Sequence, residues 1–291
     1  MLLSAWISGL GLGSMYGLMA LGFYVTYAVS GTVNFAQGSS MMLGAVLTFT
    51  FAQTLGWPLA LAIALALGLC ALYGLLVERL AVRPFAGRGS ESWLMATVAL
   101  GIVVDNLVMF TFGKEPRSLP SPLAVTPLQF DGLGVGIYPL QLLIPLVGLG
   151  LAGVLHAVSR RTRWGIALLA VVQNREAARL MGVPIQRAVA AAFALSALFA
   201  GIAGVLIAPL YNVHADMGTL FGLKAFAVAI LGGITSAWGV MFAGLLFGTA
   251  EALITATLGS GYTQILTFGL VIVALAWRPN GLFGRATLKK V

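Results

Sequence analysis

The strongest constraint on the fold of this chain is a series of apolar runs, each about as long as a bilayer core is thick. A transmembrane helix needs about 20 apolar residues, and these runs do not alternate between apolar and polar positions as strands would. Charged residues make up only 8% of the chain, against about 25% in an average soluble domain. The sequence therefore predicts an all-α polytopic membrane protein. The continuous runs are 3–29, 58–77, 92–112, 139–158, 188–210, 237–257 and 262–277.

Small residues at every fourth position predict where two of these helices pack closely. Small side chains let helix backbones approach each other inside a membrane. One ridge lies in the first run and consists of Gly9, Gly13 and Gly17. The other lies in run 188–210 and consists of Ala192, Ser196, Ala200, Gly204 and Ala208.

Two further segments predict interrupted helices, one in each half of the chain. Residues 30–55 open with the polar sequence SGTVNFAQGSS, and the apolar run 222–234 is too short to cross a bilayer core. Breaks at membrane depth are tolerated where they face protein or water, and breaks in both halves are typical of transporters with inverted repeats. We therefore expect about eight to nine transmembrane helices with inverted repeats. A plainer interpretation of the first break is a short cytoplasmic turn in which Asn34 caps the next helix.

Basic residues predict the orientation of the chain. Thirteen of the sixteen Lys and Arg lie in 78–91, 159–187 and 278–291, and short basic loops stay in the cytoplasm. This arrangement puts the N-terminus outside and gives nine passes, one of them short. If residues 222–234 re-enter on one side, the number of passes falls and one end of the chain changes sides.

The same pattern predicts a single transmembrane domain over residues 1–291. Its first half covers about 1–112, and a proline-rich external loop follows at 113–138. The second half covers about 139–277 and contains the basic loop 159–187. Residues 278–291 form a cytoplasmic tail.

Loop 159–187 is the longest polar segment between apolar runs. Its middle reads as a short helix with Leu168, Leu169, Val172 and Leu180 on one face. Such a helix at the membrane surface can carry force from a soluble partner into the spans. The alternative is a basic loop that only fixes orientation. Its basic residues are Arg160, Arg161, Arg163, Arg175, Arg179 and Arg187.

Polar side chains within or beside the spans are the candidates for a substrate pathway. The first candidates are Asn34, Gln37, Asn106 and Lys224, with Asp105 and Glu251 of second rank. Neutral amides can hydrogen-bond a solute without trapping it, and an ionisable group in a span is a functional hypothesis by default. We expect Lys224 at the outer mouth, facing Asp216. The alternative for all of them is hydrogen bonding between helices, worth about 0.6 kcal/mol on average.

Four segments together resemble a known family. They are NFAQG at 34–38, REAARLMGVPI at 175–185, GLKAFAVAILGGITSAWG at 222–239 and RPNGLFG at 278–284. In this order, and over essentially the whole chain, the sequence is similar to the membrane permeases of ABC importers for branched-chain amino acids. It looks most like the shorter of the two permeases that such systems pair as a heterodimer.

The resemblance implies a coupling site and a set of partners. Arg175, Glu176, Ala177 and Ala178, followed by Gly182, are similar to the cytoplasmic motif that docks these permeases into an ATPase. The wider motif is only partly matched after Gly182. The implied partners are a second homologous permease, two ATPase subunits and a periplasmic solute-binding protein. The implied location is the bacterial inner (plasma) membrane.

Several other functions lack their motifs in this sequence. There is no G-x-x-x-x-G-K-[ST] loop, so ATP and Mg²⁺ would be bound by the partner ATPases, and we expect no cofactor in this chain. Neither H-E-x-x-H nor G-x-S-x-G occurs, and the two His residues are isolated, so we expect no metal site and no enzyme activity. The net charge of +8 sits at the ends of apolar runs, where it meets membrane lipid rather than nucleic acid.

Alternative solutes and mechanisms remain open at this point. The same machinery in related systems serves urea, amides and small organic acids. A secondary transporter would use Asp105, Glu251 and Lys224 as coupling residues, but it leaves the REAARLMG segment unexplained. A passive channel is also compatible with hydropathy alone.

Overall fold

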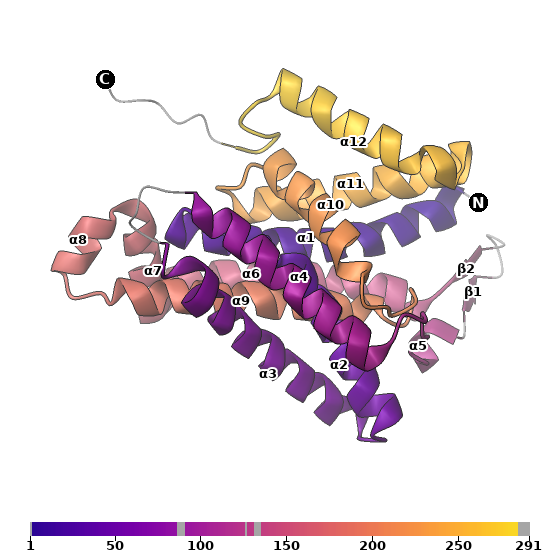
Figure 1. The fold of residues 1–291 in the computed structure, drawn as a ribbon. Helices are drawn as coiled ribbons and strands as arrows, with labels where there is room; N and C mark the ends of the chain where they lie inside the picture. Colours follow the sequence, from indigo (N-terminus) through magenta and orange to yellow (C-terminus); the bar gives the residue numbers. More distant parts are fainter. Residues whose placement is uncertain (1, 86–90, 126, 131–134, 285–291) are drawn as a thin grey trace.

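Seven helices in the described part of the chain are long and apolar enough to cross a membrane. The computed structural model describes residues 2–85, 91–125, 127–130 and 135–284 (Figure 1). The predicted all-α polytopic fold is confirmed, and the strands within these ranges are limited to a two-stranded hairpin in the connection before α6. Arg88, Arg285, Lys289 and Lys290 of the predicted basic segments lie outside the described residues.

The helices fall into long, short and connecting elements. The long helices are α1 (Leu2–Ser30), α3 (Leu59–Val77), α4 (Ser92–Phe112), α6 (Pro139–Arg161), α9 (Ile185–Ile207), α11 (Ala237–Leu258) and α12 (Ser260–Trp277). Shorter helices are α2 (Gln37–Phe49), α5 (Pro122–Val125), α7 (Arg163–Gln173), α8 (Arg175–Leu180) and α10 (Met217–Gly232). Single π-helical turns, Thr50–Thr54 and Glu78–Val82, extend α2 and α3. Strands β1 (Leu128–Phe130) and β2 (Val135–Ile137) pair antiparallel.

Helix α1 is the most buried of the seven long helices, and its glycine ridge explains why. A Cβ added at Gly13 would collide with the backbone of Gly244 on α11, and one added at Gly17 would meet Met241. Only glycine lets the two backbones come this close, so the predicted ridge is confirmed as the α1–α11 contact. Figure 1 shows α7 and α8 at one end of the bundle, with the N-terminus and the hairpin at the other.

The two halves of the bundle repeat one pattern of elements. Helices α1–α4 and α9–α12 both run long, short, long, long, and each short helix follows a break in the chain. The breaks align as TVNFAQG at 32–38 and NVHADMG at 212–218. Both segments end in glycine, Gly38 and Gly218, and these two residues pack against each other. A Cβ added at Gly38 would collide with the carbonyl of Gly218, and a Cβ added at Gly218 would collide with the carbonyl of Gly38.

The short helices leave this meeting point toward opposite ends of the bundle. The last residue of α2, Phe49, packs against Phe112 at a ring-centroid distance of 5.5 Å, beside the connection to the hairpin. Helix α10 ends where the Leu282 amide of the tail donates to the Leu231 carbonyl at 2.7 Å. The predicted interrupted helices are therefore present, and the opposite directions of α2 and α10 agree with the predicted inverted repeats. Six residues after Gly38 the first repeat has Gly44, and six after Gly218 the second has Lys224.

Two predicted elements differ from the structure. Helix α10 begins at Met217 rather than near residue 222, because Gly218 and Gly222 pack on Gly38 instead of forming a loop. The helix expected within loop 159–187 is two helices. They are separated at Asn174, whose extended backbone ends α7 and caps α8.

Candidate functional site

The break before α2 holds a fully buried amide cluster. The Gln37 Nε2 donates to the carbonyls of Met19 on α1 and Ser196 on α9, at 3.3 and 3.0 Å. The Ser196 hydroxyl donates back to Gln37 Oε1 at 2.8 Å. The Asn34 Oδ1 accepts from the Ala36 amide at 3.1 Å, and its Nδ2 donates to Gln37 Oε1 at 3.4 Å. Both candidate amides therefore bond to protein, and contact with solute stays a prediction for them.

A cavity of about 210 Å³ lies next to this cluster, between α1, α2, α4 and α10. The first turns of the two short helices form part of its wall through Gly38, Gly218 and Gly222. Phe23, Phe35, Val98, Ile102, Leu223 and Phe226 supply an apolar lining, and Ser39, Asp105 and Thr219 supply polar groups. The cavity thus combines a mostly apolar surface with one carboxylate.

Neighbouring residues of α4 point in different directions. Asp105 lines the cavity together with Gly101 and Ile102, one helical turn earlier. Asn106 lies on the exposed side of α4, and its Nδ2 donates to the Ile102 carbonyl at 2.8 Å. The structure therefore brings Asp105, rather than Asn106, next to the breaks in α2 and α10.

Lys224 forms a buried ion pair inside the bundle. Its side chain is 5% exposed, and its Nζ lies 2.5 Å from Glu251 Oε1 on α11. The Tyr16 hydroxyl of α1 donates to the other Glu251 oxygen at 3.1 Å. The prediction that Lys224 faces Asp216 is wrong. Asp216 precedes α10, its side chain is 78% exposed and it pairs with His214 at 3.5 Å. Lys224 lies two turns further along the helix, on a face that packs toward α1 and α11.

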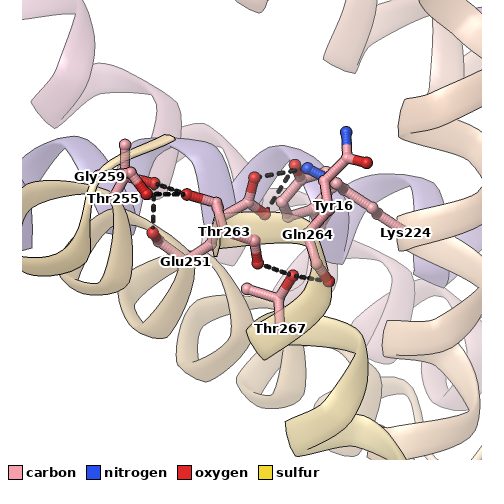
Figure 2. A network of polar contacts seen from close by, with 8 residues as sticks. All are labelled: Tyr16, Lys224, Glu251, Thr255, Gly259, Thr263, Gln264 and Thr267. Carbon is pink, nitrogen blue, oxygen red and sulfur yellow. Dashed lines mark hydrogen bonds and ion pairs between the residues drawn. The ribbon is translucent and has the colours of Figure 1, made fainter. Parts of the chain in front are cut away.

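The ion pair continues into a hydroxyl network that joins α11 to α12 (Figure 2). The Thr255 hydroxyl donates to the Glu251 carbonyl at 2.7 Å and lies 2.9 Å from the Thr263 hydroxyl. These side chains, with Lys224 and Gln264, line a second cavity of about 450 Å³. Tyr16 and the threonines were not singled out in the sequence, because hydroxyls in apolar helices carry no distinctive pattern.

The segment from α7 to α8 presents exposed apolar side chains on a fixed support. The Asn174 Oδ1 caps α8 by accepting from the Ala177 amide at 3.0 Å. The Arg175 Nη2 donates to the Val29 carbonyl near the end of α1 at 3.0 Å. Gly182 ends the segment with φ +82°, a left-handed backbone that favours glycine.

The predicted coupling residues fall on both sides of α8. Ala178 is buried, whereas Glu176 and Ala177 are exposed. Leu180 and Met181 are 88% and 85% exposed. The six arginines of loop 159–187 are exposed as well. The segment sits at the far end of the bundle from the hairpin (Figure 1).

Comparison with known proteins agrees with these features. Residues 6–275 match the family described as "Branched-chain amino acid transport system / permease component". The chain is 32% identical to the high-affinity branched-chain amino acid transport system permease protein LivH of Escherichia coli K12, covering 98% of this chain and 96% of that protein. It is also 32% identical to BraD of Pseudomonas aeruginosa, with the same coverage.

A second kind of relative matches over a shorter stretch. The permease protein LivM of Escherichia coli K12, from the same kind of transport system, is 32% identical over 120 residues, which is 40% of this chain and 28% of that protein. The family match spans nearly every described helix, from α1 to α12. This multi-pass membrane chain therefore belongs to the family of permease components of branched-chain amino acid transport systems.

Proposed function

We propose that the chain is a transmembrane permease subunit of an ATP-driven importer for branched-chain or other small amino acids. In this proposal, a periplasmic binding protein delivers the solute and separate ATPase subunits supply the energy. ATP and Mg²⁺ are bound by those subunits. The similarity to LivH, BraD and LivM supports the solute class and a second homologous permease as partner.

The observation that carries the proposal is the fixed, exposed segment α7–α8. Leu180 and Met181 are exposed, and burial of these apolar side chains in a partner's groove would be more favourable than their exposure to water. The bond from Arg175 to the Val29 carbonyl links α8 to α1. Because α1 packs on α9, α10 and α11, a displacement of α8 reaches the helices around both cavities.

The apolar cavity supports the choice of solute. Its phenylalanine and aliphatic lining suits a compact apolar side chain, and its polar groups suit the charged end of an amino acid. A permease supplied by a binding protein needs no tight site, since tight binding would slow release. The cavity's few polar groups meet that requirement.

The test is purification of the chain from its own membranes, followed by uptake of labelled leucine into vesicles. We expect nucleotide-hydrolysing subunits to co-purify and uptake to require ATP. The double variant Glu176→Lys/Gly182→Asp should abolish ATP-driven uptake but insert normally into the membrane. Glu115→Lys repeats the Glu-to-Lys part of that change at an exposed site outside α8 and is the control. Wild-type uptake by the double variant, or transport without an ATPase, would refute the proposal.

A further inference from the structure

Asp105 is a carboxylate in a membrane helix, and it has no basic partner among the residues that the structure describes. Glu78 pairs with Arg83 at 3.1 Å and Glu251 pairs with Lys224, but in the described ranges no Lys, Arg or His lies within ion-pair distance of Asp105. Its Oδ1 is buried and has no hydrogen-bond partner within that part of the chain. A carboxylate oxygen that is buried without a cation or a hydrogen bond is costly, so the position favours a cationic ligand.

The surroundings of Asp105 match one kind of cation. The hydroxyls of Ser39 and Thr219 face the same carboxylate, and all three side chains line the cavity of about 210 Å³. A primary ammonium has three N–H donors, and one carboxylate with two hydroxyl oxygens offers acceptors for all of them. A hydrated metal ion would instead meet a mostly apolar wall.

The rest of the cavity suits an aliphatic amino acid. Phe23, Phe35 and Phe226 can enclose a branched side chain. The first turns of α2 and α10 meet at Gly38 and Gly218, so two positive helix ends lie beside the space left for a carboxylate. We propose that Asp105 binds the ammonium group of the transported amino acid in this cavity. The proposal rests on the import function proposed above and assigns the residue that recognises the amino group.

A purely structural role for Asp105 makes a different prediction. In that case the carboxylate would only complement the first turns of α2 and α10. Binding would then not depend on whether a small molecule carries an amine. Asn106 offers a matched control, because it is the next residue of the same helix but lies on the exposed side.

The experiment measures weak binding by saturation-transfer NMR. The transporter is purified with its own partner subunits, placed in lipid nanodiscs and used without the binding protein. Three probes share one aliphatic chain: L-leucine, 3-methylbutylamine, which lacks the carboxylate, and 4-methylpentanoate, which lacks the ammonium. Empty nanodiscs give the background from partition into lipid. The variants are Asp105→Asn and the double variant Asp105→Asn/Asn106→Asp, which keeps the charge but moves it to the exposed face.

We expect both amine probes to bind the wild type and 4-methylpentanoate to bind about tenfold more weakly or not at all, because hydrogen bonds to charged groups are the strong ones. Both variants should lose amine binding to a similar extent. The ATPase subunits should still co-purify with them. Equal binding of 4-methylpentanoate and leucine by the wild type, or amine binding that persists in Asp105→Asn, would overturn the assignment. The wild-type arm needs no variant to fold. Failure of the proposed function is read separately, as absent ATP-driven leucine uptake by the wild type.

Discussion

Lys224 of α10 and Glu251 of α11 form an ion pair of 2.5 Å in the interior of the bundle, and Tyr16 of α1 donates to the second oxygen of the same carboxylate. Three helices from both halves of the chain therefore meet at one carboxylate. The pair is neutral as a whole, so it can be buried where a single charge could not.

Loss of one member of this pair should destabilise the protein more than loss of both. Lys224→Met leaves Glu251 buried without a cation and should cost about 3–5 kcal/mol, whereas Lys224→Met/Glu251→Met should recover most of that. Thermal unfolding of the purified protein in detergent measures the difference. Single variants as stable as the double variant would show that the charges do not interact.

The reciprocal contact of Gly38 and Gly218 should tolerate no added methyl group. Gly38→Ala or Gly218→Ala pushes a Cβ into a backbone carbonyl, and overpacking of this kind costs about 1–3 kcal/mol. Gly150→Ala on α6 is the control, because nothing lies within 4 Å of a Cβ there. We expect a lower unfolding temperature for the first two variants only. If all three behave alike, the close contact is absent in the membrane.

Asn34→Leu tests whether the buried amides serve transport or only structure. The bonds of Asn34 are local, to Ala36 and Gln37, so the bundle should persist without them. We expect slower leucine uptake with the ATPase still bound. Gln37→Leu removes bonds to α1 and α9 and should lower stability further, by about 1–3 kcal/mol for the polar groups left unpaired. Release of the ATPase by Asn34→Leu would make Asn34 structural.

Arg175→Ala should weaken the link between α8 and α1. The substitution removes the bond to the Val29 carbonyl but leaves Leu180 and Met181 in place. The ATPase should therefore still bind, while leucine uptake per ATP hydrolysed falls. Arg179→Ala is the control, because Arg179 is an exposed arginine of the same helix. Equal uptake ratios in the two variants would contradict a mechanical role for Arg175.

Helix positions could be predicted from the sequence because hydropathy and small-residue spacing are local properties. The α1 ridge, the helix break near Asn34 and the short helix before Gly233 were all readable in this way. The start of α10 could not be read, since Gly218 resembles a loop residue until Gly38 is known to lie against it. The local sequence pattern therefore predicts where helices lie, whereas the residue at which α10 begins depends on a contact between the two halves of the chain.

Side-chain partners were harder to predict for the same reason. Asp216 is close to Lys224 in sequence, whereas Glu251 is close in space only after α10 and α11 fold back on each other. Asp105 and Asn106 are adjacent, and only the packing of α4 decides which one faces the cavity. Asp105 lies four residues after Gly101 and therefore on the same face of α4, and this spacing would have favoured Asp105 over Asn106.

The presence of Lys224 where the first repeat has Gly44 has a further consequence. At Gly44 the backbones of α2 and α9 touch, since a Cβ there would collide with Gly201, whereas Lys224 lines a cavity together with residues of α1, α11 and α12. Two identical repeats would make the two faces of the membrane equivalent. Lys224 in one half and Gly44 in the other make the halves differ in charge at corresponding positions, so the two sides of the bundle are not equivalent, as a vectorial process requires.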